Sequence, residues 1–153
     1  LYPRAAAIVA NSNGVKKDLV DNFSVPAEKI SIINNGYNMA AIADRAAEPL
    51  TAAYAEIFKR PVLATGGRLT AAKGQWHMLR AFRKIKAARK DAALFLFGEG
   101  ELQTYLVRLS EELGFRTFAG AGAPPPGHDV YFPGFAPNPY KFLAKARLLR
   151  KQN

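Results

Sequence analysis

The chain has 153 residues, of which 49% are hydrophobic and 22% charged, a composition that excludes an intrinsically disordered chain. There is no cysteine, which excludes disulfide bonds and thiolate metal sites and leads us to expect a cytoplasmic location. No apolar run approaches the ~18 residues of a membrane-spanning helix. The formal charge of +10 favours an anionic partner, either a phosphate compound, a nucleic acid or an anionic membrane face.

The first part of the chain predicts two short strands around one helix. The apolar run 5–10 predicts a strand, and Ser12 is a typical N-cap for the helix that follows. Apolar residues then recur at helical spacing: Val15, Leu19 and Phe23. A second strand is predicted over 30–33, with a turn at 34–36.

From residue 61 onward strands and helices alternate regularly. Residues 39–60 before them are rich in alanine and predict partial helix, interrupted at Pro49. The predicted strands are 62–65, 93–97 and 130–132, and the predicted helices are 75–89, 102–113 and a last one from about 139. This order predicts an α/β fold with a Rossmann-like parallel sheet and crossover helices. Strand 93–97 is apolar throughout, as expected for a strand covered on both faces.

The three helices carry the apolar and capping residues expected of crossover helices. The stripes that we expect in the core are Trp76, Leu79, Phe82 and Ile85 in the first helix, and Leu102, Tyr105, Leu106, Leu109 and Leu113 in the second. Gly114 is a typical C-cap residue for the second helix. For the last helix, Asn138 is the expected N-cap and Pro139 the first helical residue.

The stretch "GGRLTAAKGQW", residues 66–76, is the strongest candidate for chemistry. It joins a buried strand to a helix, and ligands of open parallel sheets bind beyond the carboxyl ends of the strands. A helix N-terminus attracts phosphate, Arg68 can bind two phosphate oxygens, and Lys73 adds a point charge. The local sequence leaves open a simple glycine turn with both cations in solvent. It is neither a Walker A loop nor a GxGxxG motif.

Two runs of cations lack any intervening acid. The first holds Arg80, Arg83, Lys84, Lys86, Arg89 and Lys90, and the second holds Lys141, Lys145, Arg147, Arg150 and Lys151. Each run is interpreted either as a solvated helix face or as a contact with an anionic membrane surface. A nucleic-acid interface is a third hypothesis, although exposed aromatic residues do not alternate with the cations. His77 and His128 have no partner at metal-ligand spacing, so we expect no metal site.

Several motifs, in order, resemble one family. These are "AAAIVANSNGVKKDLVDNFSVPAEKISIINNGYN", "GRLTAAKGQ", "LFLFGEGELQ" and "VYFPGFAPNPYKFL". Together they are similar to the donor-binding domain of retaining glycosyltransferases of the GT-B fold, and more narrowly to glycosyltransferase family 4. The resemblance implies part of the C-terminal domain of a GT-B enzyme. It also implies transfer of a sugar from a nucleoside diphosphate, linked to UDP or GDP, with retention of anomeric configuration and without a metal or other cofactor.

The resemblance assigns roles to individual residues. Arg68 and Lys73 are expected to bind the donor diphosphate and to stabilise it as it leaves. Gly67 is expected to line the same loop. Further donor contacts are implied for Gly98, Glu99 and Gly100 in one loop, and for Phe135, Asn138 and Lys141 around the nucleobase.

The resemblance also implies that the chain is part of a larger enzyme. Residues 1–38 are similar to the end of an acceptor domain and its linker, and residues 39–153 to an incomplete donor domain. The Glu-x7-Glu element of the family is not present, so we expect little transferase activity from these residues alone. The family builds glycolipids, polysaccharide or lipopolysaccharide, which implies glycan or lipid-linked acceptors and peripheral contact with the inner membrane face. The alternative is a non-catalytic nucleotide-binding module that needs a partner chain or self-associates.

Overall fold

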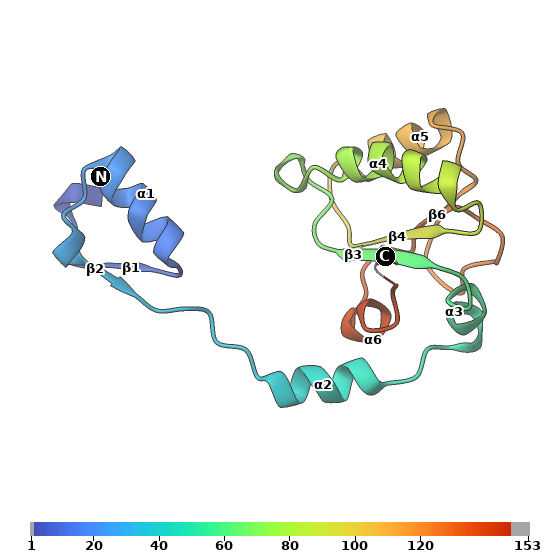
Figure 1. The fold of residues 1–153 in the computed structure, drawn as a ribbon, viewed down its shortest axis with the longest axis horizontal. Helices are drawn as coiled ribbons and strands as arrows, with labels where there is room; N and C mark the ends of the chain where they lie inside the picture. Colours follow the sequence, from blue (N-terminus) through green and yellow to red (C-terminus); the bar gives the residue numbers. More distant parts are fainter. Residues whose placement is uncertain (1, 148–153) are drawn as a thin grey trace. The chain divides into compact units, whose positions relative to one another are not determined.

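The computed structural model describes residues 2–147, and the chain divides into two compact units, Leu1–Met39 and Ala40–Asn153. Figure 1 shows the elements of both units, which are described separately below. Arg150 and Lys151 of the second basic run lie outside the described residues.

The first unit is a pair of parallel strands covered by one helix. Its elements are the 3-10 helix η1 (Tyr2–Arg4), β1 (Ile8–Ala10), α1 (Asn13–Phe23), the 3-10 helix η2 (Ala27–Lys29) and β2 (Ile30–Ile32). Ser12 caps α1 as predicted, because its Oγ accepts a hydrogen bond of 3.2 Å from the Val15 N–H. Both strands are shorter than predicted, and residues 33–38 are extended chain rather than the predicted turn.

The small core of this unit explains where its strands stop. It consists of Ala10, Leu19, Val25 and Ile30. Residues 5–7 and 33 are exposed or only partly buried, so little apolar contact holds them in a sheet. The apolar pattern located both strands but did not fix their ends.

The second unit has the predicted alternation of strands and helices. Its elements are α2 (Met39–Ala47), α3 (Ala52–Ile57), β3 (Val62–Gly66), the 3-10 helix η3 (Ala71–Lys73), α4 (Gln75–Ala88), β4 (Ala93–Phe97), α5 (Gln103–Glu112), β5 (Thr117–Ala119), β6 (Val130–Phe132) and α6 (Tyr140–Leu143). Pro49 separates α2 from α3, as predicted.

The four strands of this unit form a parallel sheet in the order β3-β4-β6-β5. The predicted α/β class with crossover helices is therefore confirmed (Figure 1). Sequence reasoning missed β5, because no strand was predicted between the helix 102–113 and the strand 130–132. Only three residues long, β5 pairs with β6 alone and is at most half-buried, so its apolar signal is weak.

Two cores lie on opposite faces of this sheet, and β4 supplies both. Its residues alternate, so that Leu94 and Leu96 face α4 and α5, whereas Phe95 and Phe97 face α3 and α6. All five β4 residues are buried, as predicted for a strand covered on both sides. Figure 1 shows α4 and α5 on one side of the sheet and α3 and α6 on the other.

The helical stripes pack largely as predicted. Leu79 and Phe82 are buried, with Trp76 and Ile85 packed against them. Tyr105 is an exception, because it is 46% exposed on α5 while Val107 packs against the core instead. A strictly helical spacing places Tyr105 at the margin of the stripe, where the sequence does not separate core from surface.

Candidate functional site

Three loops meet at the carboxyl edge of the sheet. They follow β3, β4 and β6, and parallel strands bring their carboxyl ends to the same edge. The first two loops are joined by backbone hydrogen bonds: the Gly67 N–H donates to the Phe97 carbonyl at 3.0 Å, and the Leu69 N–H donates to the Glu99 carbonyl at 2.9 Å. The Leu102 N–H returns to the Leu69 carbonyl at 3.0 Å. The two loops therefore form one packed layer.

The glycines of the second loop are required by this packing. A Cβ at Gly98 would lie 2.1 Å from the Gly67 oxygen, and one at Gly100 would lie 2.4 Å from the Leu69 oxygen. Gly98 also has a φ of +130°, which favours glycine. The family resemblance implied that Gly98 and Gly100 contact the donor. In the structure the close approach at Gly98 and Gly100 is made by the neighbouring loop.

Gly67 differs from these two glycines. A Cβ there would meet no atom within 4 Å, so the space beside Gly67 is open. The third loop is joined to the second by a hydrogen bond of 2.8 Å from the Gly98 N–H to the Gly134 carbonyl. All three loops are thus held together around an open space next to Gly67.

This space is a cavity of about 580 Å³ at the carboxyl edge. Its lining residues are Gly66, Gly67, Arg68, Phe97, Gly98, Glu99, Phe135, Ala136, Pro139 and Leu143. Five of the nine residues predicted for donor binding are among them. The lining combines apolar and backbone surface with a few polar groups, as is typical of small-molecule sites.

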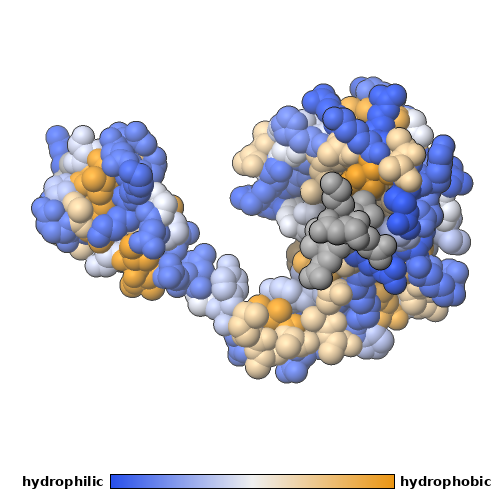
Figure 2. All heavy atoms as spheres, in the orientation of Figure 1, coloured by the Kyte–Doolittle hydropathy of each residue, from blue (hydrophilic) through white to orange (hydrophobic). Residues whose placement is uncertain are grey.

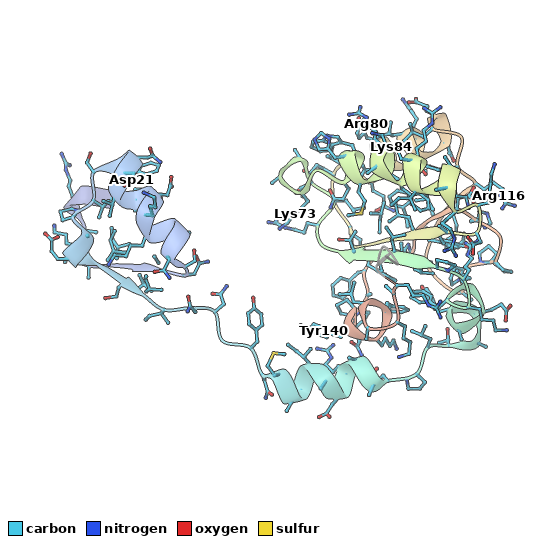
Figure 3. All side chains as sticks on the ribbon, in the orientation of Figure 1. Asp21, Lys73, Arg80, Lys84, Arg116 and Tyr140 are labelled. Atoms are coloured by element: carbon cyan, nitrogen blue, oxygen red, sulfur yellow. The ribbon has the colours of Figure 1, made fainter. Side chains whose placement is uncertain are left out.

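The two predicted phosphate-binding cations are exposed and have no side-chain partner among residues 2–147. Arg68 lines the cavity, whereas Lys73 lies at the end of η3, directly before α4. Figure 3 shows Lys73 projecting outward from this loop. Neither charge is neutralised by a described acid, so both remain able to bind an anion.

Gln75 is a residue of this loop that sequence reasoning did not single out. It is 6% exposed at the start of α4, and its Nε2 donates a hydrogen bond of 2.8 Å to the Arg68 carbonyl. Its Oε1 is buried without a partner in the described part of the chain. Its spacing in the sequence could have indicated that it is buried, because Gln75 lies on the same face of α4 as Leu79 and Phe82. Gln75 thereby holds the backbone that carries Arg68.

Asn138 and Lys141 lie at a neighbouring cavity of about 350 Å³, and neither lines the first cavity. The buried Asn138 side chain donates to the Arg45 carbonyl at 2.8 Å and accepts from the Tyr140 N–H at 3.1 Å. This second bond is the predicted N-cap interaction, although the helix is assigned from Tyr140. Lys141 Nζ lies 3.6 Å from a carboxylate oxygen of Glu48. Both side chains therefore have partners within the protein.

The amino edge of the sheet carries charges that are paired. Lys86 Nζ lies 2.6 Å from Asp129, and Asp129 also accepts a hydrogen bond of 2.9 Å from the Arg116 N–H. Burial alone would raise the pKa of Asp129, but these hydrogen bonds and the nearby positive charges hold the pKa below its ordinary value. A cavity of about 520 Å³ at this edge is lined in part by two further ion pairs, Glu56–Lys59 and Arg89–Asp91.

The described residues hold neither a cluster of metal ligands nor a helix able to cross a membrane. No group of three or more His, Cys, Asp or Glu side chains is placed to hold a metal ion there. Within that same range, every helix is too short or too polar to cross a membrane.

Comparison with known proteins identifies glycosyltransferases as relatives. No family model matches the sequence. An uncharacterized glycosyltransferase of Methanocaldococcus jannaschii is 32% identical over 143 residues, 93% of this chain and 32% of that protein. The N-acetylgalactosamine-N,N'-diacetylbacillosaminyl-diphospho-undecaprenol 4-alpha-N-acetylgalactosaminyltransferase of Campylobacter jejuni is 32% identical over 145 residues, 95% of this chain and 34% of that protein.

Solved structures give the same fold. The Anabaena protein HepE, crystallised with UDP and glucose, matches with a TM-score of 0.66 at 18% identity over 93% of this chain and 36% of its own. A glycosyltransferase of Rickettsia africae matches with a TM-score of 0.66 at 19% identity over 92% of this chain and 36% of its own. The fold is therefore that of part of a GT-B glycosyltransferase. The chain spans about a third of the length of the curated relatives that it matches.

Proposed function

We propose that this chain forms the donor-binding part of a retaining glycosyltransferase of family 4, which transfers a sugar from a UDP- or GDP-sugar to a glycan or lipid-linked acceptor. The observation that carries the proposal is the open cavity beside Gly67, with the unpaired Arg68 in its lining. Supporting observations are the glycosyltransferase names of the relatives and the diphospho-undecaprenol acceptor in the name of the Campylobacter protein.

In the proposed reaction, negative charge develops on the leaving diphosphate, next to the cations of the carboxyl edge of the sheet. During transfer, the bond between the anomeric carbon and the diphosphate oxygen breaks, and its electron pair stays on the diphosphate. The acceptor oxygen bonds to the anomeric carbon, and its proton passes to the oxygen of the leaving diphosphate. Arg68 and Lys73, next to the N-terminus of α4, would stabilise the diphosphate as it leaves. These cations would take the role that a divalent metal has in other transferases, so we propose metal-independent transfer.

Phe135 is the proposed contact for the nucleobase. It is 70% exposed and lines both cavities of the carboxyl edge. An exposed aromatic ring beside a phosphate site is suited to stacking on a base. Asn138 and Lys141 stay predictions for this region. Their existing hydrogen bond and ion pair imply that they would act by shaping the loop.

Titration calorimetry with UDP and GDP tests the proposal. Arg68→Ala or Lys73→Ala should weaken binding of the preferred nucleotide about tenfold or more, because a charge-assisted bond contributes roughly 1.5–3 kcal/mol. Lys59→Ala is the matched control, because Lys59 is also exposed and lies away from this edge. Unchanged dissociation constants for both variants would contradict the proposal. Clear turnover by these residues alone, when donor and acceptor sugars are supplied, would exclude the non-catalytic binding module and would contradict the expectation of little activity.

A further inference from the structure

The outer face of α4 carries positive charge that the fold does not use. Residues 75–90 contain six Lys or Arg and no Asp or Glu. Two of these cations have partners: Lys86 pairs with Asp129, and Arg89 pairs with Asp91. The other four are exposed and make no ion pair with any residue of the range 2–147: Arg80, Arg83, Lys84 and Lys90.

Three of the four gather on one surface. Arg80 and Lys84 are one helical turn apart on the side of α4 opposite the buried Phe82. Arg83, three residues after Arg80, is exposed at the flank of that side. Figure 3 shows Arg80 and Lys84 on the side of α4 that faces away from the sheet. Figure 2 shows hydrophilic residues along the same margin of this unit, with hydrophobic residues between them.

This arrangement opposes helix stability. Like charges three and four residues apart repel each other on a helix, and no acid intervenes to offset them. The exposed residues three or four positions away from these cations are His77, Ala81, Ala87 and Ala88. Each has a shorter side chain than Arg or Lys, so the charged ends of Arg80, Arg83 and Lys84 can approach a flat anionic surface together.

We propose that this basic face of α4, formed by Arg80, Arg83 and Lys84, docks on the anionic lipid headgroups of a membrane. Charge complementarity is the argument for the partner, and the contact would be peripheral because the face offers no large apolar side chain for insertion. Nucleic acid is a poorer fit, because no exposed aromatic residue alternates with these cations for base stacking. The inference rests on the proposed function only in that a lipid-linked acceptor would give such docking a use.

Vesicle sedimentation tests the inference directly. The protein should bind vesicles that contain phosphatidylglycerol and not vesicles of phosphatidylcholine alone, and added salt should weaken the binding. Each cation near an anionic leaflet strengthens binding about fivefold, so Arg80→Gln combined with Lys84→Gln should weaken it roughly 25-fold. The control with the same change in net charge is Lys17→Gln combined with Lys59→Gln, which should have a much smaller effect. Both control residues are exposed, and each is paired with an acid.

Two outcomes would overturn the inference. One is equal binding by the Arg80/Lys84 variant and the control variant. The other is tighter binding to single-stranded RNA than to phosphatidylglycerol vesicles at physiological salt.

Circular dichroism of both variants establishes that α4 remains folded. Titration with UDP and GDP separates this inference from the proposed function, because the Arg80/Lys84 variant should bind nucleotide like the wild type. Lost vesicle binding with intact nucleotide binding therefore concerns the α4 face alone.

Discussion

Two cations at each edge of the parallel sheet differ in whether an acid neutralises them. At the amino edge, Lys86 and Arg89 each pair with an acid, and Asp129 accepts bonds from Lys86 and from the Arg116 backbone. At the carboxyl edge, Arg68 and Lys73 are exposed without a partner among the described residues. Both edges contain a cavity of several hundred Å³, so cavity size does not distinguish them.

The difference separates charge that supports folding from charge that is available to a ligand. Lys86 contributes to the free energy of unfolding, because its removal leaves the buried Asp129 without its closest positive partner. An unpaired exposed cation contributes little to stability, so its removal should affect binding instead. Substitution of Gly98 tests the packing of the loops at the carboxyl edge. Substitutions of Lys86, Lys73 and Asp129 test whether the paired charges support folding while the unpaired ones do not.

Gly98→Ala should have the largest effect on stability. The new Cβ would lie 2.1 Å from the Gly67 oxygen and 2.9 Å from its carbonyl carbon, so two backbone loops would have to separate. We expect a loss of about 3 kcal/mol or more in the free energy of unfolding, measured by urea denaturation. Gly120→Ala is the matched control, because its nearest contact would be an ordinary 3.8 Å and the loss should stay within about 0.5 kcal/mol. Similar losses in both variants would show that the loops are not tightly packed.

Lys86→Met and Lys73→Met compare the two edges directly. Removing Lys86 leaves the carboxylate of Asp129, which is 10% exposed, with only weaker positive neighbours, and should cost about 2 kcal/mol of stability. Removing Lys73 should change stability by less than about 0.5 kcal/mol. Thermal and urea unfolding of both variants measure this difference. The separation fails if Lys73→Met destabilises the protein as much as Lys86→Met does.

The smallest expected effect is a dependence of stability on pH at the amino edge. The folded protein holds the pKa of Asp129 below its ordinary value, so Asp129 stabilises the fold above its unfolded pKa of about 3.9. That contribution is lost as the pH falls through the lower folded pKa. The stability difference between wild type and Asp129→Asn should therefore shrink as the pH decreases below about 4. A difference that stays constant over this range would contradict the assignment to Asp129.

Long apolar patterns made much of the second unit predictable. The predicted bounds of β4 are confirmed, and α4 begins where predicted, because five consecutive apolar residues and a four-residue stripe are strong signals. β5 was not predicted, since three residues at most half-buried carry little pattern. The unequal burial of Tyr105 and Val107 depends on how α5 packs on α4 and β5, which local sequence does not encode.

The sequence predicted which loops meet at the carboxyl edge better than it predicted the contacts between them. Gly67, Arg68, Gly98, Glu99 and Phe135 line one cavity because parallel strands bring their loops to one edge. Asn138 was not separable from them by sequence, because its partner, the Arg45 carbonyl, is distant in the chain. The local sequence likewise does not explain Gly98 and Gly100. Glycine is required at both positions because the backbone of Gly67 and Leu69 leaves no room for a side chain.

The joined loops after β3 and β4 restrict how this edge can be altered. Backbone hydrogen bonds connect Gly67 to Phe97 and Leu69 to both Glu99 and Leu102, and Gly98 leaves no room for a side chain between the loops. Neither loop has a shape of its own that can be transplanted without the other. Under the proposed function, a change of donor preference by loop grafting would have to exchange both loops as a matched pair.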